Sequence, residues 1–555
     1  MPDRTHDNEL VARAEALAGG LLADAISRRR WRERLQGERV ARLLRDPDGL
    51  AFVLALTDEV LRIRDPRRAA EYLEALVAEN DSPRFLGPVD RQLLRIGAAA
   101  AVRYPRIIMP LVKARVRAEL SSFIVAAEPR PFARHLRRRR EAGTRLNINL
   151  LGEEILGDEE AERRLQAVLA LLRRPDVDYV SVKVSAVCSQ LNIVAFDHEV
   201  DRVAGQIRRL FDEARAHSPA KFVNLDMEEY QDLELTLAVF QRVLDEERYG
   251  GLDAGIVLQA YIPDSFAALD ELLPWARRRH DRWGGRIKIR IVKGANLAME
   301  QVEAEVAGLP QAPFTDKAGV DANYKRMLDA VLDPVNADAV RVGVATHNLF
   351  EAAWALVLSA ERGLRDMVEL EMLEGMAPSI AAAVQDQAGG LLLYTPIARR
   401  ADSESVIAYL IRRFQENAGP ENFLHHQFDL LPGTAVWQRE RDRFRTAVRE
   451  RHLTPERTRR TQDRRHEADA RSRELSQAFR NEPDTDTAVA ANRSWIAEQM
   501  RPLPELDVEL VPVVAAGRTV RDGTVADGDD PAVPDEVAHR WVQADETLVD
   551  AAVAT

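Results

Sequence analysis

Eight short β-rich runs alternate with longer helical patterns between residues 145 and 396, and no other feature constrains the fold as strongly. A strand, a helix and a further strand form a right-handed crossover that places both strands parallel in one sheet. The runs are 145–151, 177–184, 221–227, 255–261, 286–294, 340–348, 367–373 and 390–396. Eight such units are what a closed (β/α)8 barrel requires, so the sequence predicts an α/β, TIM-like barrel.

An open, doubly wound parallel sheet is the competing architecture. Such a sheet usually carries a G-x-G-x-x-G turn after its first strand. The segment "NINLLGEEILG" at 147–157 contains no such turn, which favours the closed barrel.

The regions on either side of the predicted barrel differ from it in their pattern of apolar and charged residues. Residues 1–140 repeat apolar residues at three-to-four spacing, which predicts an all-helical region. The barrel is expected over 141–430 and a charged helical linker over 431–480. Residues 481–555, whose last fifty are rich in Asp, Val, Ala and Pro, are expected to be loosely ordered and partly disordered.

Charge limits the classes of partner. The formal net charge of −12 argues against a general nucleic-acid binder. The basic run 134–143, "RHLRRRREAG", is either a local nucleic-acid patch or a solvated helix face, and the net charge favours the second interpretation.

Cysteine usage and hydropathy bear on the compartment. Cys188 is the one cysteine, so neither a disulfide framework nor a cysteine-built metal site is possible, and no metal site is predicted. The N-terminal "MPDRTHDNEL" has no apolar signal core, and no run of 18 apolar residues occurs. These features suit a cytoplasmic protein and leave peripheral membrane contact open.

Polar side chains recur at the ends of the predicted strands. In a (β/α)8 barrel the C-terminal strand ends share one mouth, where catalytic residues lie. The residues at these ends are Lys183; Asp226, Glu228 and Glu229; Gln259 and Tyr261; Arg290 and Lys293; Thr346, His347 and Asn348; and Tyr394. The seventh strand is the exception, because it offers only the apolar Leu373 and Met376. A single one is most often a salt bridge or a helix cap. The series predicts a polar site with a charged ligand, because buried charges must be paired.

Two adjacent arginines stand in an apolar helix after the eighth strand, "YLIRRFQENAG" at 409–419. Arg412 and Arg413 point in directions about 100° apart, and Glu416 lies four and three residues after them, within reach of either. The alternatives are a solvent-facing Arg–Glu pair and a bidentate clamp for a carboxylate or phosphate. The apolar neighbours and the place over the barrel mouth favour the clamp.

Nine motifs in order resemble the proline dehydrogenase domain of flavoenzymes, including the bifunctional proline utilization A proteins. The resemblance covers about residues 145 to 425. Its motifs are "SVKVSA", "LDMEE", "GIVLQAYIPDS", "RIVKGAN", "FTDKAGVDANYKRML", "ATHN", "LEMLEGM", "YTPI" and "YLIRRFQENAG".

The resemblance implies a distorted (β/α)8 barrel with non-covalently bound FAD. The helices of residues 1–140 resemble the dimerisation-type helical arm that wraps the barrel in the bifunctional proteins. The resemblance also implies oxidation of L-proline to Δ1-pyrroline-5-carboxylate by hydride transfer to flavin N5, the first step of proline catabolism to glutamate. Electrons would pass to a membrane quinone, which implies a cytoplasmic protein with peripheral association at the inner face of the membrane.

Roles carried over from the family divide into two sets. For the substrate, Arg412, Arg413 and Lys183 would hold the carboxylate, Asp226 would lie near the ring nitrogen, Tyr394 and Leu373 would pack on the ring, and Glu416 would orient the arginines. For FAD, Arg290 would lie near N5, with Arg413 also in contact. Further cofactor contacts would come from Gln259, Val292, Lys293, Gly294, Ala295, Thr315, Lys317, Thr346, His347 and Asn348.

Three departures refine the expectation. Asn296 and Leu297 follow "KGA" where many relatives have an aromatic residue against the substrate. Tyr394 matches enzymes that prefer proline, whereas hydroxyproline-preferring relatives tend to be smaller there. The N-terminus does not resemble the ribbon-helix-helix module of DNA-binding members, so no nucleic-acid binding is predicted.

The segment 481–500 resembles the lead-in to the aldehyde dehydrogenase half of the bifunctional proteins. No dinucleotide-binding pattern follows residue 430, and Cys188 is expected inside the second barrel strand. The chain is thus expected to be either the front part of a longer protein or a truncated member. Its partner would be an aldehyde dehydrogenase half or a separate pyrroline-5-carboxylate dehydrogenase.

Two other functions stay open on the residues alone. One is a flavin-free barrel enzyme acting on another small carboxylate or phosphate. The other is a non-catalytic scaffold or regulator whose helical arm binds a partner.

Overall fold

The computed structural model separates the chain into two compact units, Met1–Arg493 and Ser494–Thr555. It describes residues 4–29, 31, 33, 42–43, 46–60, 63–79, 83, 85–120, 124–152, 155, 157–399, 409, 422–426, 430–455, 458–467, 481–500, 510–531 and 533–555.

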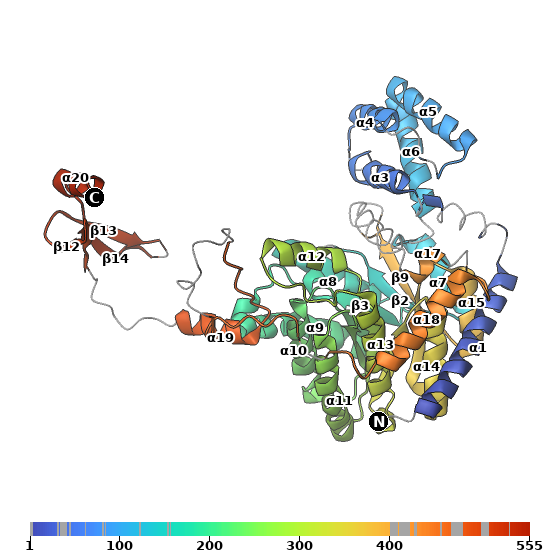
Figure 1. Ribbon diagram of the computed structural model, residues 1–555. Coiled ribbons are helices and arrows are strands. Elements are labelled where there is room, and N and C mark those ends of the chain that lie inside the picture. The colour runs from blue at the N-terminus through green and yellow to red at the C-terminus, as the bar shows by residue number, and fades with distance from the viewer. Residues whose placement is uncertain are drawn as a thin grey trace. The chain divides into compact units, whose positions relative to one another are not determined.

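A closed barrel of parallel strands forms the centre of the first unit (Figure 1). Its strands are β2 (Arg145–Leu150), β3 (Tyr179–Lys183), β4 (Phe222–Asp226), β5 (Ala254–Gln259), β6 (Ile287–Val292), β7 (Val340–Ala345), β8 (Val368–Leu373) and β9 (Leu392–Ala398). Each pairs with the next in sequence order, and β9 pairs with both β8 and β2, which closes the ring. The predicted (β/α)8 barrel is confirmed.

Helices follow each strand up to β8 and surround the barrel. They are α8 (Asp158–Leu172), α9 (Phe196–Arg215), α10 (Asp232–Leu244), α11 (Asp264–Trp283), α12 (Leu297–Val306), α13 (Lys317–Val331), α14 (Leu349–Glu361) and α15 (Pro378–Ala388). The predicted helix around 404–419 lies outside the described residues except for Tyr409.

The apolar core lies between the strands and these helices. Helix α9 shows the pattern: Val200, Val203, Ala204, Ile207 and Phe211 recur at three-to-four spacing and are buried against the barrel. Predicted strand 340–348 is shorter in the structure, because Asn348 already caps α14 by accepting a hydrogen bond from the backbone N–H of Phe350.

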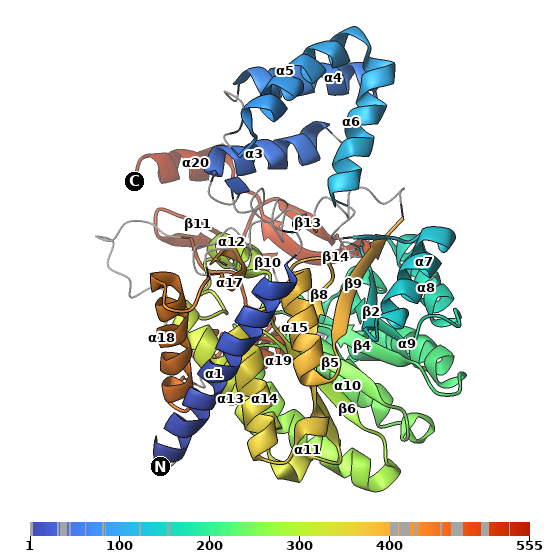
Figure 2. The same cartoon turned by 90° about the vertical axis from the view of Figure 1, so that its right-hand side faces the viewer.

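Helix α14 is apolar nearly all round and buried from Leu349 to Ser359, which requires cover on its outer side. Helix α1 (Arg4–Arg28) provides part of that cover and lies along α14 and α15 in both views (Figure 2). Helix α18 (Ala435–Glu450) packs against α13 and α14, where Phe444 stacks on Phe350 with ring centroids 5.6 Å apart.

Further helices precede the barrel. Helices α3 (Pro47–Ala55), α4 (Pro66–Glu79), α5 (Pro88–Arg103) and α6 (Pro105–Leu120) share an apolar cluster of their own that includes Phe52, Leu73 and Met109. Helix α7 (Pro129–Glu141) carries the basic run, in which Arg139 pairs with Glu374 and Arg140 with Asp178. The short strand β1 (Val125–Ala126) extends the barrel sheet beside β9.

Regular elements extend further toward the C-terminus than the sequence indicated. Helix α19 (Ala490–Gln499) precedes β10 (Leu510–Val511), β11 (Val513–Ala515), β12 (Arg518–Val520), β13 (Val525–Asp530), β14 (Val533–Val542) and α20 (Glu546–Val553). Strands β13 and β14 form an antiparallel pair, as do β11 and β12.

One placement from the sequence is wrong. Cys188 does not lie in a barrel strand, because β3 ends at Lys183 and a short 3-10 turn over Val184–Ala186 intervenes. Burial raises the pKa of its thiol to about 12, so this cysteine is a packed side chain. The predicted boundaries at 140, 430 and 480 remain a proposal about segments of the first unit.

Candidate active site at the barrel mouth

Asp226, the last residue of β4, accepts hydrogen bonds from residues of β2, β6 and β9 and from one residue of its own strand. The donors are Asn149 Nδ2 at 3.2 Å, Asn224 Nδ2 at 2.8 Å, the Tyr394 hydroxyl at 2.9 Å and the Arg290 guanidinium. The parallel register places these strand ends at one mouth, so residues far apart in sequence meet around one carboxylate.

Arg290 of β6 is the cation of this group. Burial opposes its charge, but the carboxylates of Asp226 and Glu371 raise the pKa of Arg290 above its ordinary value. Its guanidinium also lies 5.0 Å from the centre of the Tyr394 ring. Burial and the nearby Asp226 carboxylate raise the pKa of Tyr394, so the hydroxyl stays a proton donor at neutral pH.

Lys183, the last residue of β3, pairs with Glu228 in the loop after β4. Ser185 Oγ donates to the same carboxylate at 2.6 Å. The backbone carbonyl of Glu228 accepts from Gln259 Nε2 at 3.0 Å and from Asn296 Nδ2 at 3.3 Å. The loop after β4 therefore connects the ends of β3 and β5 with the start of α12.

The loop between β7 and α14 reaches the same mouth. The backbone N–H of Thr346 donates to the Glu371 carbonyl at 3.0 Å, and the Thr346 hydroxyl accepts from the N–H of Asn348 at 3.0 Å. His347 Nε2 accepts from the backbone N–H of Leu373 at 3.0 Å. The predicted residues of β7 and β8 are thus linked.

Lys293, directly after β6, belongs to what we call the lysine network: Lys293, Lys317, Asp321, Lys325 and Glu351. Lys293 Nζ lies 2.5 Å from Asp321 and 3.2 Å from Glu351. Lys317 pairs with Asp321 at 3.1 Å, and Lys325 pairs with Glu351. Although burial opposes the charge of Lys293, the two carboxylates raise its pKa above the ordinary value.

The remaining predicted cofactor contacts lie in or beside the segment after β6. Val292 ends β6, and Thr315 immediately precedes Asp316, the N-cap of α13. Gly294 has φ of 128°, and a Cβ there would clash with the ring of Tyr261. Glycine is therefore required at 294, and Ala295 follows it into the turn before α12.

Three predicted residues are not placed. Arg412, Arg413 and Glu416 lie outside the described residues, so their roles stay predictions.

Several polar residues in the barrel and beside it were not predicted as site residues. They are Asn149, Ser181, Asn224, Lys288, Asp321, Lys325, Glu351 and Glu371. The sequence did contain a signal for some of them. Strands of a parallel sheet are usually continuous apolar runs, whereas several strands of this chain have polar residues at every second position. Asn147 and Asn149, or Lys288 and Arg290, show this alternation and point into the barrel.

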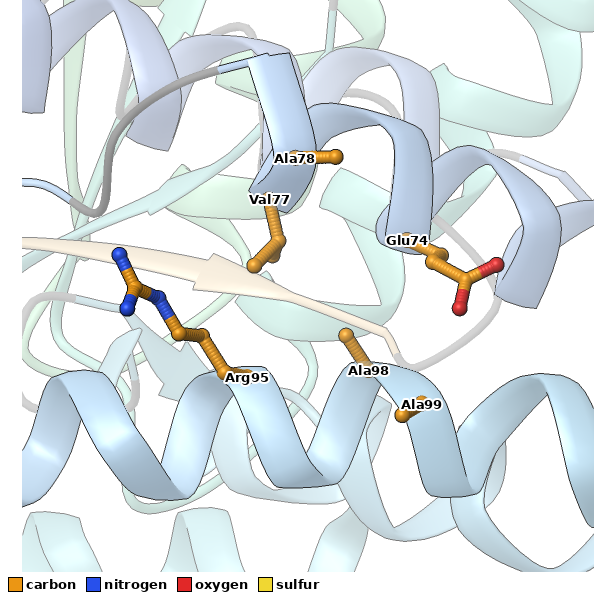
Figure 3. Close-up of a pocket in the computed structure, with 6 residues that line it drawn as sticks. All are labelled: Glu74, Val77, Ala78, Arg95, Ala98 and Ala99. Carbon is orange, nitrogen blue, oxygen red and sulfur yellow. The ribbon is translucent and has the colours of Figure 1, made fainter.

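A pocket also lies between α4 and α5, lined by Glu74, Val77, Ala78, Arg95, Ala98 and Ala99 (Figure 3). The side chains of Glu74 and Arg95 extend in opposite directions across it. Because its charged groups do not converge, the barrel mouth is the better candidate for the chemistry.

Comparisons with known proteins identify the family of the barrel. A family model for proline dehydrogenase matches residues 132–426, more than half of the chain. Proline dehydrogenase from Deinococcus radiodurans is 29% identical over 279 residues, which cover 49% of this chain and 77% of that protein. Bifunctional protein PutA from Klebsiella aerogenes is 27% identical over 311 residues. The match covers 53% of this chain and 23% of that PutA, so this chain spans less than a quarter of the curated relatives of that type.

Solved structures show the same relationship. Proline utilization A from Corynebacterium freiburgense has a TM-score of 0.62 and 40% identity, with 73% of this chain and 38% of that chain covered. The counterpart from Bdellovibrio bacteriovorus, solved after inactivation by N-propargylglycine, has a TM-score of 0.75 over 98% of this chain and 53% of its own. At 23% identity, that likeness bears on the fold alone. With the family model spanning the barrel and its mouth, this chain belongs to the proline dehydrogenase family.

Proposed function

We propose that this chain oxidises L-proline to Δ1-pyrroline-5-carboxylate with FAD as its cofactor and a quinone as the final electron acceptor. The observation that carries the proposal is the buried group of Asp226, Arg290 and Tyr394 at the barrel mouth. A carboxylate and a cation held there by hydrogen bonds suit a small zwitterion that must be oriented against a redox cofactor.

The residues at the mouth fit FAD. Gln259 Oε1 and Arg290 Nε are buried and have no hydrogen-bond partner among the described residues. Unsatisfied buried polar atoms are costly, and one acceptor and one donor at neighbouring strand ends match the polar edge of a flavin ring. Gln259, Arg290 and Lys293 would hold the ring, and Lys317 and Thr346 to Asn348 would hold the remainder of the cofactor.

FAD, when bound, supplies the acceptor for the hydride that leaves the substrate carbon. The chain's own residues bind and orient the substrate. Lys183, with Arg412 and Arg413, would hold the carboxylate, and Asp226 would face the ring nitrogen. The Tyr394 ring, fixed by its hydroxyl bond to Asp226, would present an apolar surface to the proline ring.

The partners follow from the same proposal. A quinone acceptor implies peripheral association with the inner face of a membrane from the cytoplasm, and a pyrroline-5-carboxylate dehydrogenase, fused or separate, would consume the product. Among the residues that the structure describes, no helix combines the length and apolar character needed to cross a bilayer.

The proposal is tested by mixing the purified protein with FAD, removing free FAD and recording the spectrum, where bands near about 380 and 450 nm report bound flavin. Turnover with a dye acceptor is then compared for L-proline and 4-hydroxyproline, with proline expected to be preferred. No bound flavin, with turnover of another carboxylate or phosphate, would favour a flavin-free enzyme. Neither flavin nor turnover would favour a scaffold or regulator.

A further inference from the structure

The lysine network runs from the barrel mouth into the protein interior. The side chain of Lys293 is 23% exposed, that of Glu351 is 4% exposed and that of Lys325 is fully buried. Lys293 directly follows β6, Glu351 lies on the first turn of α14, and Lys325 lies on α13. Glu351 therefore connects a lysine at the mouth to a lysine that no substrate or cofactor at the mouth can reach.

Burial of the Lys325 ammonium and the Glu351 carboxylate costs folding free energy, which suggests a functional reason for keeping the pair. A fully buried ammonium needs a paired carboxylate, and replacing such pairs by apolar residues is often neutral or stabilising. Burial lowers the pKa of Lys325, whereas Glu351 opposes that change. The ring of Phe444 from α18 lies 5.1 Å from Lys325 Nζ, which encloses the ammonium in an apolar surrounding.

The network also has an excess of positive charge. Three lysines face two carboxylates, Asp321 and Glu351, so one cation has no matching anion among these five residues. Lys293 and Lys325 lower the pKa of Glu351 against its burial, which keeps that carboxylate ionised. A surplus of positive charge beside the mouth stabilises a nearby group that gains negative charge.

We infer that Glu351 and Lys325 are positioning residues: Lys325 holds Glu351, and Glu351 fixes the Lys293 ammonium where it promotes electron uptake by the cofactor. This inference rests on the proposed function, because it assumes a flavin beside Lys293. It adds two helix residues, remote from the strand ends, to the machinery of the reaction.

The test compares Glu351→Gln and Lys325→Met with a matched control, Asp329→Asn. Asp329 and Arg362 form a salt bridge between α13 and the end of α14, at the opposite end of the same two helices. If Glu351 only fastened α14 to α13, the control would show the same defect. Bound FAD, the flavin reduction potential and steady-state kinetics are measured for all three variants and the parent protein.

Glu351→Gln should lower kcat/KM by about tenfold or more, chiefly in kcat, and change the flavin potential. Lys325→Met removes one positive charge and should move the potential to a more negative value, whereas Asp329→Asn should leave the potential unchanged and kcat/KM within about twofold. An unchanged potential in both network variants, or an equal change in Asp329→Asn, would overturn the inference.

A second readout needs no cofactor. In the apo-protein, the Tm shift of the double variant Lys293→Met/Lys325→Met should differ from the sum of the two single shifts, because both lysines form ion pairs with Glu351. Additive Tm shifts would show that the two lysines are not coupled through Glu351. Failure of the parent protein to bind FAD would instead refute the proposed function, and the Tm measurement would still test whether Glu351 couples the two lysines.

Discussion

At the scale of single residues, the mouth is organised by Asp226, whose carboxylate receives donors from Asn149, Asn224, Arg290 and Tyr394. The carboxylate and the Arg290 guanidinium are both almost completely buried. Removal of one partner from a buried ion pair leaves the other charge uncompensated, at a cost of about 3–5 kcal/mol. The same carboxylate would face the substrate, so stability and activity depend on one group.

Asp226→Asn should therefore reduce kcat/KM for proline by about 100-fold or more and lower Tm by about 5 °C or more, as measured by dye-linked kinetics and thermal unfolding. The matched control is Asp178→Asn, which breaks an exposed ion pair with Arg140 and should change stability by less than about 1 kcal/mol. Equal effects of the two substitutions would contradict the role assigned to Asp226.

Glu300 on α12 provides a second prediction at this scale. Burial raises its pKa from 4.5 to about 7, while Glu229 and Glu303 add to the rise and the Tyr230 N–H and Arg460 oppose it. Between these pH values the native state keeps a proton that the unfolded chain loses, so the Glu300 contribution to stability falls as pH rises from about 4.5 to 7.

Glu300→Gln keeps an acceptor for the Tyr230 N–H, which donates to Glu300 at 2.7 Å. The variant should be more stable than the parent at pH 8, by on the order of 3 kcal/mol, and the difference should vanish near pH 4.5. Tm measured across this range tests it, with Glu305→Gln on the exposed side of α12 as control. A difference that does not depend on pH would count against a buried, proton-holding Glu300.

At the scale of elements, the interior of the barrel leaves little spare volume beside its charges. Gly343 of β7 faces Glu371 and Lys288, and a Cβ at this position would clash with the Glu371 carboxylate. The residue is small because an ion pair occupies the space next to it.

Gly343→Ala should thus destabilise the protein by about 1–3 kcal/mol through overpacking. Gly205, within α9, has open space where an alanine methyl group would lie, with no contacting atom within 4 Å, and Gly205→Ala should instead stabilise by about 0.4–1 kcal/mol. Opposite signs in Tm are expected for the same chemical change. A Gly343→Ala variant as stable as Gly205→Ala would show that the ion pair has room to move.

The strands and their polar ends were predictable because alternation of strands and helices leads to one mouth, and Asp226, Arg290 and Tyr394 do meet there. Residues on helices were harder to find. Lys325 stands in "ANYKRML", which has the appearance of a solvated helix face. Its burial depends on Phe444, which lies more than a hundred positions later in the chain. Contacts of that kind exist only after the chain has folded.

At the scale of the whole molecule, the first unit holds a complete core. Its main apolar cluster runs from Leu10 to Val448, with Ala488 packed against it, and includes no described residue of Ser494–Thr555. The second unit forms its own paired strands.

A chain that ends at Met500 should accordingly keep the Tm and, on the proposed function, the FAD content of the longer chain, as measured by thermal unfolding and absorbance. A decrease in Tm of more than about 5 °C would mean that the second unit contributes to the stability of the barrel.

Helix α1 has a consequence for synthesis of the protein. Its buried side chains Leu10, Ala14, Ala18, Leu21 and Ala25 lie on one face, and Glu15 pairs with Arg445 at 430 positions' separation. At about 5–20 residues per second, the ribosome needs roughly 20 to 90 s to pass from one to the other. During that interval α1 has no completed surface to pack against, so its apolar face stays exposed on the nascent chain until α14, α15 and α18 have been made.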